Sequence, residues 1–178
     1  MRILAISVFV LTCLVVLILQ LRAIFPNDAG LKKADQEMLK NLGATLAREN
    51  TKHLTQPIPT ADIIGSNWTA ICILTPYENR FDDNHPAGKA ANAALHAAKI
   101  DIADELEFVI VLLLEDGGHR IIRAPRTAEV DFVGNVKKAA PGLTERYEPS
   151  SCGYRHSAYI VPYTSSSGRN NFYLWEKK

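Results

Sequence analysis

The segment F-D-D-N-H-P holds side chains that could bind a metal ion. Asp82, Asp83 and His85 bring two carboxylates and an imidazole together within this stretch, and such groups bind hard cations and zinc. The spacing matches no established metal motif, and Asp, Asn and Pro are also the usual residues of an exposed loop. A metal-dependent site and a plain surface loop both remain open. We expect no bound cofactor.

A second segment could supply a nucleophile. Cys152 is followed closely by Tyr154, Arg155 and His156, and a free thiolate with a base nearby would suit a hydrolase. A hydrolase of this kind must also explain the presence of Cys72. The role of Cys152 therefore depends on the compartment in which the chain folds.

An almost unbroken apolar run occupies Ile3 to Leu21. As a helix it would extend roughly 28 Å, which is about one bilayer core. The run passes into Arg22 and then Pro26 rather than into small residues, so it is a poor signal-peptidase site. It predicts an uncleaved transmembrane anchor over residues 1–25, in contact with the membrane from Ile3 to Leu21. Flanking charges are nearly balanced and leave the orientation to other features.

The cysteines give independent evidence on the orientation of the chain. With Cys13 inside the apolar run, Cys72 and Cys152 are the two that remain. A pair of cysteines in an exported chain is most simply interpreted as one disulfide. Closing a loop of about 80 residues would stabilise the fold by about 4.5 kcal/mol in the chain-entropy model. The alternative is two unrelated buried thiols.

Charge argues against one class of partner. The chain has 20 Lys and Arg against 19 Asp and Glu, and two of the arginines, Arg2 and Arg22, flank the apolar run. The rest of the chain, from Asn27 onward, has no basic surplus that could condense onto phosphates. We expect no nucleic-acid partner.

Residues 26–60 are predicted to join the anchor to a domain. Apolar residues recur at helical spacing from Leu31 to Glu49, with charged residues between them, which indicates an amphipathic helix. This helix could pair with a partner or lie on the membrane, or it could pack on its own domain. A linker with two prolines extends from Thr51 to Gly65.

Residues 61–178 have the size and pattern of one α+β domain with a mainly antiparallel sheet and one inserted helix. The turn Asp116-Gly117-Gly118 predicts a tight hairpin, because Asp and Gly tolerate positive φ angles. The expected strands are Trp68 to Leu74, Leu106 to Leu114, His119 to Ala124, His156 to Tyr163 and Asn171 to Glu176, and the expected helix is Gly88 to Lys99.

Two further groups of side chains could form binding surfaces. Arg120, Arg123 and Arg126 could make a cationic stripe for an acidic partner, or they could be the solvent-facing side of one strand. Late in the chain, Tyr163, Tyr173 or Trp175 could present an aromatic binding surface, since such side chains suit interfaces.

The chain resembles a loose group of small, uncharacterised bacterial envelope proteins and lipoproteins. The resemblance rests on the pattern W-x-x-x-C-x-x-x-P-Y at Trp68, Cys72 and Pro76-Tyr77, with Pro125-Arg126 and Asp131-Phe132 later in the chain. It implies a bacterial, exported protein and brings no assigned reaction. The present chain differs from lipid-anchored members in using a membrane helix.

These features predict a single-pass protein of the inner (plasma) membrane, with its C-terminal domain in the periplasm or outside. We expect it to bind another envelope protein without catalysis, as an accessory subunit or an immunity-type protein. The alternative is a small periplasmic hydrolase or metal-dependent enzyme. Thiol titration separates the two, because a hydrolase built on Cys152 needs that thiol to be reactive.

Overall fold

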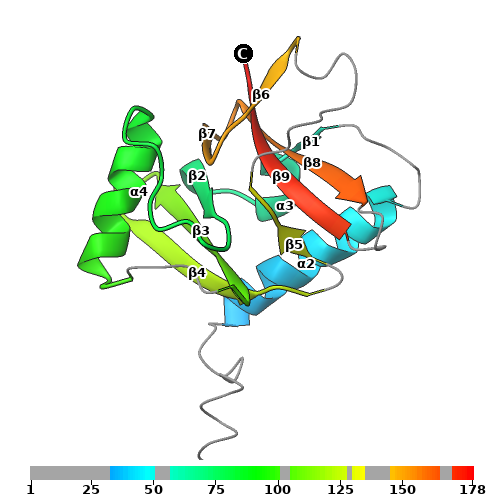
Figure 1. Cartoon of the computed structure of the whole chain (residues 1–178), viewed down its shortest axis with the longest axis horizontal. Helices are drawn as coiled ribbons and strands as arrows, with labels where there is room; N and C mark the ends of the chain where they lie inside the picture. The colour runs from blue at the N-terminus through cyan, green and yellow to red at the C-terminus, as the bar shows by residue number, and fades with distance from the viewer. Residues whose placement is uncertain (1–32, 51–56, 101–104, 128–129, 135–144, 165–169) are drawn as a thin grey trace, which may run out of the picture. The chain divides into compact units, whose positions relative to one another are not determined.

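The computed structural model describes residues 33–50, 57–100, 105–127, 130–134, 145–164 and 170–178, so the predicted membrane segment lies outside the described residues. None of the helices within these ranges is long and apolar enough to cross a membrane. The described residues form an α+β domain with mainly antiparallel strands (Figure 1). The fold class agrees with the sequence prediction, but the strands form two sheets rather than one.

The first sheet, which we call the helix-covered sheet, has the strand order β4-β3-β2-β7. Its strands are β2 (Trp68–Leu74), β3 (Glu107–Leu114), β4 (His119–Pro125) and β7 (Cys152–Tyr154). The β3–β4 hairpin closes as predicted, with the Leu114 amide donating to the Gly118 carbonyl at 2.9 Å and Gly117 at φ 81°. β2 and β3 are almost continuously apolar because they are buried on both faces.

Helix α4 (Pro86–Ala97) covers one face of this sheet (Figure 1). Its small residues Ala87, Ala91 and Ala94 pack in one core cluster with Val109 and Val111 of β3. Short side chains let the helix approach the sheet closely. The same helix requires a glycine at its first turn, because a Cβ on Gly88 would collide with the backbone carbonyl of Asp82.

The second sheet, which we call the C-terminal sheet, has the order β1-β8-β9-β5, with β6 also paired to β9. The long pair is β8 (Ala158–Thr164) with β9 (Asn170–Lys177), which corresponds to the predicted terminal hairpin. Three short strands join it: β1 (Ile58–Pro59), β5 (Asp131–Phe132), which runs parallel to β9, and β6 (Tyr147–Pro149). Helix α3 (Ala61–Ile64) comes after β1 within the stretch expected to be a linker.

Helix α2 (Lys33–Asn50) belongs to the same folded unit. Met38 and Leu42 on one of its faces are buried, and Asp35 forms an ion pair with Arg120 of β4. A Cβ on Gly43 would lie 3.2 Å from the Val130 side chain, so the helix also packs close to the segment before β5. Among the interpretations that the sequence left open, the structure shows a helix packed on its own domain.

Three phenylalanine rings connect the two sheets. Phe132 of β5 contacts Phe108 of β3, with ring centroids 5.1 Å apart, and Phe172 of β9, with centroids 6.0 Å apart. All three are about 1% exposed. Aromatic pairs of this kind contribute about 0.5–1.5 kcal/mol each beyond their area burial. The sheets therefore share one core.

Candidate functional site

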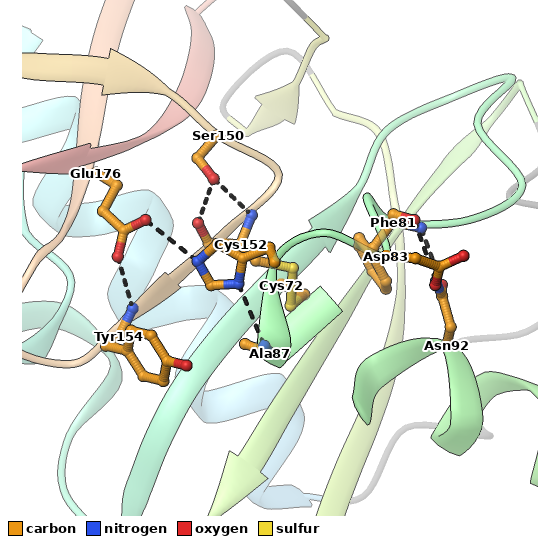
Figure 2. Close-up of a disulfide and its surroundings, with 10 residues drawn as sticks. Cys72, Phe81, Asp83, Ala87, Asn92, Ser150, Cys152, Tyr154 and Glu176 are labelled. Atoms are coloured by element: carbon orange, nitrogen blue, oxygen red, sulfur yellow. Dashed lines mark hydrogen bonds and ion pairs between the residues drawn. A yellow bond between two sulfur atoms is a disulfide. The ribbon is translucent and has the colours of Figure 1, made fainter. Parts of the chain in front are cut away.

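The disulfide predicted from the sequence is present between Cys72 of β2 and Cys152 of β7 (Figure 2). The two residues are direct cross-strand partners, and neither is exposed. Cys152 is therefore not a free thiolate, and the nucleophile interpretation does not apply to the bonded form. The two unrelated thiols that the sequence also allowed are excluded.

The other members of the proposed nucleophile segment pack against the framework. The Tyr154 ring stacks on that of His156 at 6.0 Å, and the Arg155 guanidinium lies over the Trp68 ring at the same distance. Arg155 also contacts Glu115 at 3.3 Å. These contacts hold the strand end in place rather than activating a thiol.

His85 uses both ring nitrogens within the fold. Nδ1 accepts a hydrogen bond from the Ala87 amide at 3.2 Å and so caps α4, while Nε2 lies 3.2 Å from Oε2 of Glu176 in β9. Because Nδ1 is an acceptor, the proton of the neutral ring is on Nε2 and is donated to the Glu176 carboxylate. No lone pair remains for a metal ion or for a catalytic base.

The two aspartates beside His85 also accept hydrogen bonds from nearby asparagine residues. Asp82 accepts from the backbone and side chain of Asn84 at 2.9 and 3.0 Å, and Asp83 accepts from the Asn92 amide of α4 at 2.7 Å (Figure 2). In the described part of the chain, no three His, Cys, Asp or Glu side chains are arranged to hold a metal ion. The loop organises the first turn of α4.

The three predicted arginines do not form one cationic stripe. Arg120 and Arg123 are three residues apart on β4, so their side chains point to opposite faces of the strand. Each arginine contacts an acid: Arg120 with Asp35, Arg123 with Glu107 and Arg126 with Asp131.

The Arg126–Asp131 contact is bidentate, at 2.7 and 2.8 Å, and Asp131 is buried. Hydrogen bonding to this carboxylate raises the pKa of the Arg126 guanidinium above its ordinary value. The three arginines of the predicted stripe therefore form ion pairs with acidic residues of the same domain.

Among the aromatic residues near the C-terminus, Trp175 does not form part of the binding surface that the sequence suggested. Trp175 is 1% exposed and clusters with Val161, so it belongs to the core rather than to a surface. No described residue accepts a hydrogen bond from its indole nitrogen. Tyr173 is half-buried and faces a cavity, and the side chain of Tyr163 lies outside the described residues.

That cavity is the strongest candidate site. It has a volume of about 430 Å³ and lies at the end of β2, between segments of both sheets. Ile73, Phe132 and Leu174 give it an apolar part, and the hydroxyls of Thr75, Ser150 and Ser151 border it. Its lining also includes these acidic or basic side chains: Glu78, Arg80, Asp82, His85, Glu148 and Glu176.

Comparisons of the chain with protein-family models, with curated proteins and with solved structures give no match. The candidate site therefore rests on geometry.

The carboxylates of the cavity differ in how they are held. Glu78 folds back onto the turn after β2, where it accepts from the Thr75 amide at 2.9 Å and from its hydroxyl at 2.7 Å. Glu176 accepts from His85 and, at 2.7 Å, from the Ser157 hydroxyl. Glu148 is exposed, and no described residue forms a hydrogen bond or ion pair with its carboxylate.

Sequence reasoning found Asp82 and His85 but missed the three glutamates. Glu78, Glu148 and Glu176 are far apart in the chain and meet because β2, β6 and β9 come together. Glu176 ends a predicted strand, yet nothing in its neighbourhood indicates that it faces His85. The proximity of the three glutamates follows from the topology of the sheets, which cannot be inferred from a local sequence pattern.

Proposed function

We propose that this chain is a membrane-anchored, extracytoplasmic protein whose domain binds another envelope protein without catalysis, as an accessory subunit or an immunity-type protein. The Cys72–Cys152 disulfide is the observation that carries the proposal. Disulfides form and persist in oxidising compartments and are rare in the cytosol. An apolar run from Ile3 to Leu21 supplies a means of export and retention.

The state of the reactive groups supports binding over catalysis. Cys152 is bonded, His85 has both nitrogens engaged, and Asp82 and Asp83 accept bonds from asparagines close to their loop. Cys152 and His85 are therefore not available as a nucleophile and a general base. The cavity and the outer surface remain as places for a partner.

The first test concerns topology and the thiols. The full-length protein is expressed in bacterial membranes with a reporter fused after Lys178. The same membranes are treated with a membrane-impermeant maleimide, with and without reductant. We expect the reporter to be active outside the cytoplasm and the maleimide to label Cys72 and Cys152 only after reduction and denaturation. A reporter active only in the cytoplasm, or a reactive Cys152 in the native protein, would refute the proposal.

The second test concerns the partner. Full-length protein is cross-linked in intact cells, and a matched control carries residues 1–32 fused to an unrelated domain. We expect one protein to be cross-linked to the full chain and not to the control, because the binding surface is on the domain. If the same protein were cross-linked to the control in equal amount, the binding surface would be on the anchor, which would contradict the proposal.

A further inference from the structure

The cavity at the end of β2 has the size and composition of a binding site. Its volume of about 430 Å³ lies within the range of roughly 300–1,000 Å³ that is typical of ligand pockets. Ile73 and Phe132 offer apolar contact on one side, and polar groups gather on the other. Separate stretches of chain from both sheets build it, so its shape is set by the fold rather than by one loop.

Among the described residues of the lining, negative charge predominates. Glu78, Asp82, Glu148 and Glu176 supply carboxylates, and Arg80 supplies a guanidinium. The Arg80 side chain is 74% exposed and lies 3.8 Å from Asp83, so another acid outside the lining balances part of its charge. The acidic wall is therefore complementary to a cation.

The strand register adds a separate observation. Glu148 of β6 and Glu176 of β9 are direct partners in the antiparallel β6–β9 pair, and like charges at directly opposite positions destabilise a sheet. Glu176 has His85 and Ser157 as hydrogen-bond partners. Glu148 has no such partner among the described residues, and the Arg80 guanidinium of the lining contacts Asp83 instead.

We propose that the cavity receives a cationic side chain, arginine or lysine, from a basic segment of the partner protein. The head group binds between Glu148 and Glu176, and the alkyl stem lies along Ile73, Phe132 and Leu174. The inference rests on the proposed function only in assigning the cation to a protein. Its chemical core, recognition of a guanidinium or ammonium group, can be tested without knowing that protein.

The direct test uses the full-length protein in detergent and two small probes, N-acetyl-arginine methylamide and N-acetyl-citrulline methylamide, with binding measured by calorimetry. The probes have nearly the same shape, and only the arginine derivative carries a charge. We expect the arginine probe to bind about tenfold more tightly, in line with hydrogen bonds to charged groups, and to weaken with added salt. Equal affinity for both probes, or no binding of either, would overturn the inference.

Single substitutions of glutamates test whether the probe binds in this cavity. Glu148→Gln should weaken binding of the arginine probe about tenfold, because it removes the unpartnered carboxylate. Glu145→Gln makes the same change on an exposed glutamate that does not line the cavity, and we expect it to leave the affinity unchanged. Equal effects of the two variants would show a general charge effect and refute the assignment.

Glu148→Lys adds the melting temperature as a second measurement, which needs no ligand. A lysine at this position would place an opposite charge directly across from Glu176, so we expect a higher melting temperature together with loss of probe binding. Glu145→Lys should change neither. A lower melting temperature with normal probe binding would contradict the inference, because the like-charge pair would then have no bearing on a ligand. If the probe results hold and no protein is cross-linked in cells, the proposed function fails while the cation site stands.

Discussion

The two sheets are built from the chain in different ways. In the helix-covered sheet, β2, β3 and β4 are seven or eight residues long and are consecutive strands of the chain, and β2 and β3 are largely buried between α4 and the shared core (Figure 1). The C-terminal sheet collects β1, β5 and β6, of two or three residues each, around the long β8–β9 pair. Most of the cavity wall comes from this second sheet and its connections.

This difference between the sheets suggests that one sheet mainly stabilises the fold and that the other mainly forms the candidate binding site. The long apolar strands β2 and β3, which are connected through α4, bury much of the core. The short strands bring polar side chains from distant parts of the chain to one place. The Phe108–Phe132–Phe172 contacts and the His85–Glu176 hydrogen bond tie the two halves together. The disulfide lies within the helix-covered sheet and fixes β7 just before the chain enters β8. Removing each in turn tests whether the halves unfold as one unit.

The two tryptophans make this test possible, because Trp68 lies in β2 and Trp175 in β9, so each reports on one sheet. Urea unfolding can be measured by fluorescence in single-tryptophan backgrounds made with Trp68→Phe or Trp175→Phe. Coincident midpoints indicate one cooperative unit.

The largest effect is expected from removing the disulfide. Cys72→Ala with Cys152→Ala should lower the free energy of unfolding by up to about 4.5 kcal/mol, because the unfolded chain regains the freedom of a long loop. The measurement is urea unfolding in the two single-tryptophan backgrounds. Cys13→Ala is the control and should have no effect. An unchanged midpoint in the double variant would mean that the bond contributes nothing to stability.

A smaller loss, about 3 kcal/mol, is expected for Phe132→Ala, which leaves a cavity between the sheets. Because Phe132 contacts both Phe108 and Phe172, both tryptophan probes should shift to the same new midpoint. Phe132→Leu, which keeps most of the volume, should have a clearly milder effect. If only the Trp175 signal moved, the sheets would be separate folding units and the shared core would be disproved.

The smallest effect concerns His85. His85→Ala removes both the helix cap and the contact with Glu176, whereas His85→Asn retains a good capping residue and loses only the contact. We expect His85→Ala to be less stable than His85→Asn by about 1 kcal/mol, measured by thermal unfolding. Equal stability of the two variants would show that the Ala87 amide does not depend on the cap.

The sequence predicted the helix-covered sheet better than the C-terminal one, for physical reasons. Local apolar runs and turn residues define β2 and the β3–β4 hairpin, so the sequence predicts β2 at its observed bounds and the hairpin from Asp116 and the two glycines. β1, β5 and β6 have no periodicity of their own, since two or three residues are too few to show it. Their positions depend on the β8–β9 pair to which they bind.

The same distinction applies to the candidate site. The disulfide could be predicted because cysteine pairing depends on number and compartment. The sequence shows Asp82, Asp83 and His85 as one group of polar side chains. Their partners Asn84, Asn92 and Glu176 depend on how the loop folds over α4. The acidic cavity could not be predicted, because its carboxylates come from separate segments.

The sequence separation of 80 residues between the bonded cysteines has a consequence for a molecule that a protease has cut. A single cut anywhere between Cys72 and Cys152 would release no fragment, because both pieces would stay linked through sulfur. The two pieces would separate in a denaturing gel only after a reducing agent was added. A nick in this part of the chain would thus leave the N-terminal segment and the C-terminal hairpin covalently connected.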